Sequence, residues 1–197
     1  MKNKRIHLIL MLIMLTTLIG ACGRNSYTPK PVGYIRFDLP EKNYETYDDA
    51  RLPFTFEKAS EAEVVWKKED RRHRWLDINY PQYHGVVYLT YNAMRGSEDL
   101  KGQIDTSYRL MKIHFDYSSG LDEQQFFNEP DHVYGSTYLI KGQNVASTYQ
   151  FWLTDSTRHF LHGALFIDCT PNNDSLAPIL EYLQSDIQHL IETVKWK

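Results

Sequence analysis

The chain is poor in cysteine: two occur among its 197 residues, Cys22 and Cys169. Cys22 follows directly on an apolar N-terminal run and is the candidate for lipidation described below, so one free thiol remains. No disulfide can then form within the chain. In an oxidising compartment the protein must be stabilised by its hydrophobic core alone.

Basic residues are not in excess either. From Cys22 onward the chain holds 19 Lys and Arg against 25 Asp and Glu, a net charge of −6. Proteins that bind nucleic acid carry a basic patch or stripe. The mild acidity therefore gives no support to a nucleic-acid partner, nor to bulk attraction toward an anionic membrane.

Catalytic signatures are missing as well. The sequence has no Gly-x-Ser-x-Gly elbow, no His-Glu-x-x-His run and no phosphate-cradling glycine loop. His159 and His162 are three apart on a predicted strand, so we expect them on opposite faces. Cys169 ends an apolar strand and is interpreted as a small buried residue, the alternative being a nucleophile that needs a nearby base. We predict no catalytic residue.

One loop is rich in acids. Oxygen-rich loops can bind calcium, but the spacing of these residues matches no known calcium loop. We interpret the loop as solvated and predict neither a metal site nor a cofactor. The residues concerned are Asp122, Glu123, Glu129, Asp131 and His132.

The N-terminus holds the strongest signal that is present. Basic residues precede an apolar run from Ile6 to Ile19, and small residues then lead to Cys22 in the order Leu18-Ile19-Gly20-Ala21-Cys22. This order is typical of a secretory signal peptide that ends in a lipobox. The run has 14 residues, fewer than the roughly 20 that a spanning helix needs. The alternatives are an uncleaved membrane helix or a plain signal peptide.

The lipobox divides the chain. We expect residues 1–21 to be cleaved and Cys22 to receive a diacylglyceryl group and an acyl chain such as palmitate. Residues 22–33 form a lipidated tether, whose polar stretch of nine residues from Gly23 to Pro31 reaches at most about 30 Å. Residues 34–197 then form one domain held close to the membrane.

Strands are predicted where apolar and aromatic residues alternate or cluster between turn residues. A first strand or extended arm spans 33–40, and the interval 121–132 has no clear pattern. A charged run from Lys67 to Arg74 is interpreted as a solvated hairpin tip, the alternative being a contact with lipid headgroups or an acidic partner. The other predicted strands are 54–57, 63–66, 75–80, 84–91, 134–141, 145–154 and 159–169.

Two helices are predicted from apolar spacing. The first spans 97–115, with Ser97 as its N-cap. The second opens at Asn172 or Asn173 and carries an apolar stripe from Leu176 to Val194 that docks on the core. Apolar residues on both faces of strand 159–169 indicate that both sides are covered. The fold class is therefore a single α+β domain with an antiparallel sheet flanked by helices, similar in outline to Mog1/PsbP-like folds.

The arm carries a resemblance to a known family. A lipobox, a Pro-Lys-Pro tether and then Gly-Tyr-Ile-Arg-Phe-Asp-Leu-Pro-Glu-Lys at residues 33–42 resemble the gliding-motility lipoprotein GldD family of Bacteroidetes. The resemblance implies a non-enzymatic accessory lipoprotein of gliding motility and type IX secretion, with other lipoproteins of that machinery as partners. The arm is also the candidate partner surface, through Tyr34, Arg36, Phe37 and Asp38.

The residues after Cys22 bear on location. No acid precedes Asp38, whereas lipoproteins of this group that reach the cell surface usually carry acids just after the cysteine. We therefore expect the protein to be anchored in the inner leaflet of the outer membrane and to face the periplasm. Two alternatives stay open: a periplasmic hydrolase that uses Cys169 or the histidines, and a small-molecule carrier with a pocket between sheet and helix.

Overall fold

The computed structural model describes residues 39–142, 145–168 and 173–197. Cys22, Cys169 and the four arm residues lie outside these ranges. Along the described residues no helix is long and apolar enough to cross a membrane. The elements are β1 (Tyr44–Tyr47), β2 (Phe54–Ala59), β3 (Glu63–Glu69), β4 (His73–Tyr80), η1 (Pro81–Tyr83), β5 (Gly85–Ala93), α2 (Ser97–Lys112), η2 (Phe115–Tyr117), β6 (Gly120–Asn128), β7 (Val133–Lys141), β8 (Tyr149–Thr154), β9 (His159–Ile167), α3 (Asn173–Thr193) and β10 (Lys195–Trp196).

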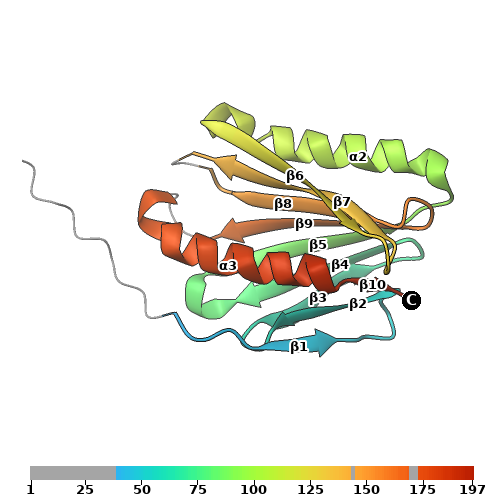
Figure 1. Cartoon of the computed structure of the whole chain (residues 1–197), viewed down its shortest axis with the longest axis horizontal. Coiled ribbons are helices and arrows are strands. Elements are labelled where there is room, and N and C mark those ends of the chain that lie inside the picture. The colour runs from blue at the N-terminus through green and yellow to red at the C-terminus, as the bar shows by residue number, and fades with distance from the viewer. Residues whose placement is uncertain (1–38, 143–144, 169–172) are drawn as a thin grey trace, which may run out of the picture. The chain divides into compact units, whose positions relative to one another are not determined.

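The strands form two antiparallel sheets (Figure 1). The large sheet has seven strands in the order β3-β4-β5-β9-β8-β7-β6, and the small sheet has the order β1-β2-β10. Strands β7, β8 and β9 follow one another in both sequence and space, as expected of a meander. The predicted antiparallel meander and the α+β class are therefore confirmed.

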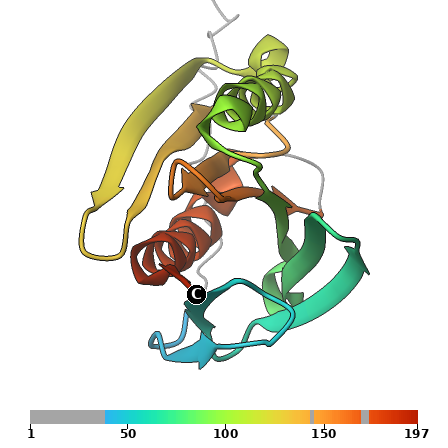
Figure 2. The same ribbon diagram turned by 90° about the vertical axis from the view of Figure 1, so that its right-hand side faces the viewer.

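The two helices cover different parts of the large sheet. Seen from its end, the large sheet curves around α3, and α2 lies on the opposite side of the sheet (Figure 2). We call the side toward α3 the inner face and the side toward α2 the outer face. Helix α3 also packs on β2 of the small sheet, whereas α2 contacts β8 and β9. The prediction that β9 is covered on both sides is thus confirmed.

The inner face holds the main hydrophobic core. Alternate residues of β4, such as Leu76, Ile78 and Tyr80, point to this face because side chains alternate along a strand. The predicted apolar stripe of α3 meets them, with Leu183 and Ile191 fully buried. Burying one side chain of this size contributes about 1.5–3 kcal/mol. This core is therefore the main source of stability in the described residues, which contain no cysteine.

The outer face holds a much smaller core. Met111 of α2 packs with Tyr138, Ile140 and Val145, and Trp152 lies at the margin of this cluster. The cluster lies beneath α2 on the β7–β9 side of the sheet. The cluster includes no residue of β3, β4 or β5. The outer face of these strands is therefore left partly uncovered.

Three local predictions were wrong. Residues 120–128 are not irregular but form β6, an edge strand with most side chains in solvent, so the period-two hydrophobic signal is absent. Ser97 is the first residue of α2, and Gly96 occupies the N-cap position without a side-chain cap. Strands β1 and β10 were missed because four and two residues are too short to show a pattern.

The segment before β1 is fastened to α3. Lys42 Nζ lies 2.6 Å from Asp186 Oδ1, and it sits 4.0 Å from the centroid of the Tyr182 ring. Tyr44 donates a hydrogen bond of 3.0 Å to the same carboxylate oxygen. Because the Asp186 side chain is fully buried, the ammonium and hydroxyl groups offset the cost of burying its charge. This contact fixes the point at which the chain enters the domain.

Candidate interaction surface

The uncovered part of the outer face forms a groove beside α2. Strands β4 and β5 each send alternate side chains to this face, and β9 contributes Phe166. Three adjoining hollows of about 740, 620 and 300 Å³ lie along it. We call this surface the outer groove, and its principal lining residues are Lys68, Trp75, Asp77, Tyr88, Ile113 and Phe166.

The largest hollow is polar. Asp77, Asn79, His84 and Asp168 line it at the end where β4, β5 and β9 meet. Asp77 is buried and pairs with Lys67, whose Nζ lies 3.1 Å from its carboxylate. Asn79 and His84 add further hydrogen-bonding groups to the hollow. This end of the groove can thus bind polar atoms.

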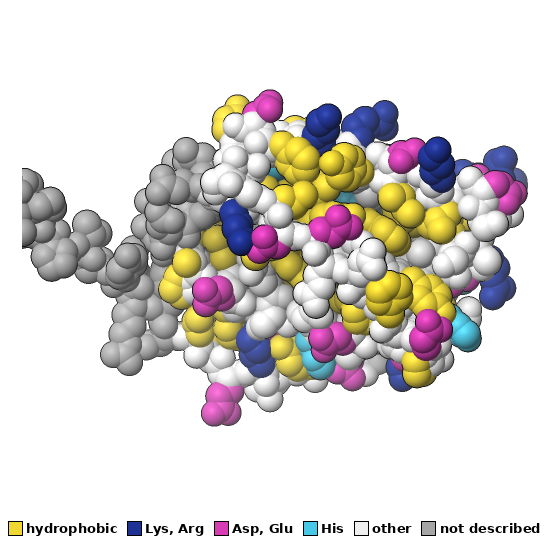
Figure 3. Space-filling model, turned by 45° about the horizontal axis from the view of Figure 1, so that its top comes forward, with side chains coloured by type: hydrophobic (Ala, Val, Ile, Leu, Met, Phe, Trp, Pro, Cys, Tyr) yellow, Lys and Arg dark blue, Asp and Glu magenta, His cyan; other side chains and the backbone are white. Residues whose placement is uncertain are grey.

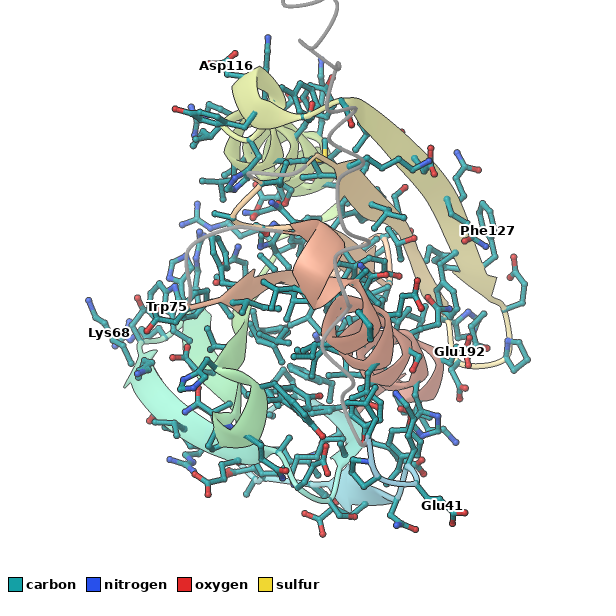
Figure 4. The ribbon with its side chains drawn as sticks, turned by 90° about the vertical axis from the view of Figure 1, so that its left-hand side faces the viewer. Glu41, Lys68, Trp75, Asp116, Phe127 and Glu192 are labelled. Carbon is teal, nitrogen blue, oxygen red and sulfur yellow. The ribbon has the colours of Figure 1, made fainter. Side chains whose placement is uncertain are left out.

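The second hollow is aromatic and cationic. Trp75 stacks on His73 with ring centroids 5.3 Å apart, and Lys68 Nζ lies 5.5 Å from the Trp75 ring. Asp70 holds His73 through contacts of 2.9 and 3.0 Å. Figure 4 shows Trp75 and Lys68 together on one side of the domain, away from Phe127 and Glu192. An ordered indole beside an ammonium group suits a partner with apolar and acidic groups.

The third hollow separates the sheet from the C-terminal end of α2. Leu110, Ile113 and His114 come from the helical side, and His162 and Phe166 come from β9. The rings of His114 and Phe166 are 5.9 Å apart. Burial lowers the pKa of His162 to about 4 and also lowers the pKa of His114. Both imidazoles are therefore neutral at pH 7, and this end of the groove is apolar.

Exposed hydrophobic side chains also line the groove. Tyr88 of β5, Leu110 of α2 and Ile113, the residue that follows α2, line its third hollow. They are 45%, 46% and 65% exposed, respectively. Tyr108 and Tyr117 are exposed as well but line none of the three hollows. Figure 3 shows hydrophobic side chains beside Lys and Arg near the upper edge of the domain. Clustered exposed apolar groups rimmed by charge mark interaction sites.

The two histidines that the sequence offered as candidate catalytic residues, His159 and His162, lie apart in the structure. His159 lies on the inner face, where its Nδ1 is 2.9 Å from the Tyr91 hydroxyl and its ring stacks on Trp196. His162 lies on the outer face, so the expectation of opposite faces is confirmed. The His159 ring contacts a phenol and an indole, and the His162 ring lines the third hollow of the groove, so the two imidazoles do not share a site.

The acidic residues have separate partners. Asp122 pairs with Lys141 at 2.5 Å, and Glu129 accepts a hydrogen bond of 3.0 Å from Tyr134. Asp131 accepts one from Asn128. Over the described residues no group of three or more His, Cys, Asp or Glu side chains is placed to hold a metal ion. The charged run 67–74 does form a hairpin, with its tip between β3 and β4.

Sequence reasoning missed the outer groove. A sequence signal for it was present. Trp75 in β4 and Tyr88 in β5 are aromatic residues at positions that alternate with the inner-face residues, so they point to the other face of the sheet. An aromatic residue on the outward side of a half-buried strand indicates a second covered face or a binding face. Whether the face is covered or available for binding depends on where α2 packs, and the packing position of α2 cannot be predicted from the sequence pattern.

The described elements define a class of protein, an α+β domain whose antiparallel sheet is closed by one helix and left partly open beside another. The chain matches the family described as gliding motility lipoprotein GldD over residues 24–196. It therefore belongs to the gliding motility lipoprotein GldD family, as its arm and lipobox predicted. Membership gives the chain an accessory role in gliding motility and an association with the cell envelope.

A solved structure is also similar. The solution structure of cyanobacterial PsbP (CyanoP) from Synechocystis sp. PCC 6803 matches 85% of this chain and 100% of that chain, at 13% identity and a TM-score of 0.49. No curated protein matches the chain.

Proposed function

We propose that the protein is a non-enzymatic accessory lipoprotein that acts by binding another protein through the outer groove. A lipid on Cys22 holds it in the inner leaflet of the outer membrane, facing the periplasm. Its partner is another lipoprotein of the gliding and type IX secretion machinery. The observation that carries the proposal is that exposed apolar side chains, those of Tyr88, Leu110 and Ile113, line this groove.

The composition of the groove defines the partner. Trp75 and Tyr88 supply large amphipathic rings, which are enriched among the residues that dominate protein–protein binding. Lys68 is exposed beside Trp75, so the partner segment should carry a carboxylate there. The apolar end near Ile113 and Phe166 requires an aliphatic or aromatic anchor. The partner is thus a protein segment with apolar anchors and acidic flanks.

A second candidate is a small-molecule carrier. The largest hollow, about 740 Å³, brings Asp77, Asn79, His84 and Asp168 to one place, and ligand sites of roughly 300–1,000 Å³ combine apolar walls with a few convergent polar groups. A polar metabolite bound there would leave the exposed apolar residues of α2 uncovered. Because a protein partner would cover these apolar residues as well, we favour a protein partner over a small molecule.

Site-specific photo-crosslinking in cells tests the choice. A photoreactive residue in place of Tyr88 should capture a discrete envelope protein. The matched control is the same residue in place of Glu192, which is exposed on α3 and lies on the other side of the domain (Figure 4). Equal capture from both positions, or none from Tyr88 in abundant and membrane-associated protein, would contradict the proposal.

The anchor and the location have tests of their own. Cys22→Ala should abolish labelling with an alkyne fatty acid and release the protein from the membrane fraction. Protease added to intact cells should leave the wild-type protein intact, and permeabilising the outer membrane should expose it. Digestion in intact cells would show that the protein is exposed at the cell surface. This result would change the proposed location but not the proposed binding groove.

A further inference from the structure

The two edges of the large sheet are built differently. Strand β3 has a register shift between Trp66 and Lys68, and its end is charged by Lys67, Lys68 and Glu69. Bulges and lysines are the usual means by which proteins prevent an edge strand from pairing with another chain. Strand β6, at the other edge, pairs with β7 without interruption over nine residues.

Strand β6 lacks these protections. Its sequence, Gly-Leu-Asp-Glu-Gln-Gln-Phe-Phe-Asn, has no proline and no lysine. Residues 122–125 are exposed, and Phe127 is 65% exposed. Phe127 stands away from the side of the domain that bears Trp75 (Figure 4). On the outward side of β6, no described strand is paired with it, so a regular row of backbone donors and acceptors is available.

We propose that β6 pairs antiparallel with β6 of a second copy of this chain, which joins two large sheets into one. Residues that oppose each other across an antiparallel pair lie on the same face. With the two-fold axis at Gln125, Gln125 faces its own copy and Glu123 faces Phe127. The exposed phenylalanine then packs on the aliphatic part of the glutamate and is removed from water.

The charge pattern of β6 favours a second copy in this orientation. The acids Asp122 and Glu123 occupy the first half of the strand, and Phe126 and Phe127 occupy the second half. An antiparallel pair centred on the glutamines places each acidic half against a phenylalanine half. A parallel pair would place acid against acid, which is destabilising. Asp122 is in addition neutralised by Lys141 within its own chain.

A foreign basic strand is the competing occupant. Its main attraction would be to the β6 acids, one of which already has a cation as its partner. It would also leave the exposed phenylalanine without an assigned contact, whereas self-pairing accounts for both halves of the strand. The second copy is therefore the occupant that the residues fit.

The dimer should be weak in solution. A single pair of nine-residue strands is small beside the roughly 1,200–2,000 Å² buried in a standard stable interface. Confinement to a membrane surface through the proposed lipid anchor raises the effective concentration of the two strands. Self-association should therefore depend on surface density, and recovery in the membrane fraction reports the anchor separately from the dimer.

Cysteine crosslinking tests the pairing. The mature acylated lipoprotein is placed in phosphatidylethanolamine and phosphatidylglycerol vesicles as Gln125→Cys and mildly oxidised. Gln124→Cys is the register control, because residue 124 faces Phe126 of the second copy and not its own counterpart. Directly opposed residues of an antiparallel pair have Cα atoms about 4.5–5.5 Å apart, which is within disulfide reach. A further control is Lys68→Cys, which is also exposed and lies on the β3 edge. The wild-type protein, which keeps Cys169, sets the background.

A disulfide-linked dimer at Gln125→Cys, about tenfold or more above the Gln124→Cys and Lys68→Cys controls, supports the proposal because opposed cysteines react selectively. Equal crosslinking at both edges indicates random collision and overturns it. Backbone amides of β6 should also exchange more slowly with solvent at high surface density than at low density. Protection that does not depend on density, without a dimer, would mean that another part of the same chain covers β6, and this also overturns the proposal.

Discussion

The two faces of the large sheet differ in how completely they are covered. On the inner face, 24 buried residues form one core with α3 and the small sheet, whereas the outer face has a cluster of four beneath α2. Exposed large hydrophobic residues occur mainly at the outer side, on β5, α2 and η2. One face is thus devoted to stability, and the other keeps apolar surface available for binding.

This division explains how the domain can expose apolar residues and still fold. Because α3 and the small sheet stabilise the inner face, α2 need not cover the whole outer face. The uncovered strands are then free to differ in their outward residues without loss of stability. Substitutions on the two faces should therefore separate folding from binding.

The largest loss of stability is expected from Phe54→Ala. The Phe54 ring is fully buried and lies within 6 Å of the rings of Phe56, Tyr91 and Trp196. Removing a buried phenylalanine should lower the free energy of unfolding by about 3–5 kcal/mol. Urea denaturation measures this loss. The control Tyr117→Ala, an exposed ring on the outer side, should change stability by at most about 0.5 kcal/mol.

A pair of glycines gives the next largest difference. A methyl group at Gly163 would lie 2.2 Å from the Phe151 ring, whereas one at Gly102 in α2 meets nothing within 4 Å. Gly163→Ala should destabilise by about 1–3 kcal/mol through overpacking. Gly102→Ala should stabilise by about 0.5–1 kcal/mol, because alanine favours a helix interior. Thermal unfolding measures whether each substitution raises or lowers the stability. A change in the same direction for both variants would contradict the assigned difference in packing between the two positions.

Acidification tests the outer core. Burial lowers the pKa of His162 to about 4, below the value of about 6.5 in the unfolded chain. Between these two values the unfolded state binds more protons, so stability falls as the pH falls from 6.5 toward 4. The loss between pH 7 and pH 5 should reach up to about 2 kcal/mol.

Unfolding midpoints at both pH values measure this loss, and His162→Gln should reduce it. Burial also lowers the pKa of His114 and His159. Part of the slope should therefore persist in the variant. An unchanged slope would show that His162 is protonated as readily in the folded state as in the unfolded one.

The sequence predicted the fold where the pattern is periodic. The alternation of Leu76, Ile78 and Tyr80 identified β4, and the helical stripe from Leu176 to Val194 identified α3. Both belong to the well-buried inner core, where burial and sequence pattern agree. Strand β6 was missed because an exposed edge strand carries polar residues on both faces, so only its backbone pairing defines it.

The candidate site was less predictable. The sequence located the cysteine that is predicted to be lipidated and the family arm, both outside the described residues. Neither pattern includes a residue that lines the outer groove. The groove arises because β4, β5 and β9 become neighbours through pairings between distant residues, such as Tyr88 with Ala164. Such pairings depend on the topology, which local spacing does not determine.

The smallest effect on folding is expected at Tyr88, where the largest effect on partner binding is also expected. Tyr88 is 45% exposed, and its ring lies 5.2 Å from Phe166 in the outer groove. Tyr88→Ala should change the free energy of unfolding by at most about 0.5 kcal/mol. If Tyr88 anchors the partner, its truncation should cost about 2 kcal/mol of binding, or roughly thirtyfold in affinity. Co-purification of the captured partner with the acylated protein measures this loss. Phe127→Ala, which removes another exposed ring, on β6, is the control: this variant should retain the partner and lose self-association. Loss of the partner in both variants, or in neither, would mean that the outer groove is not the binding surface.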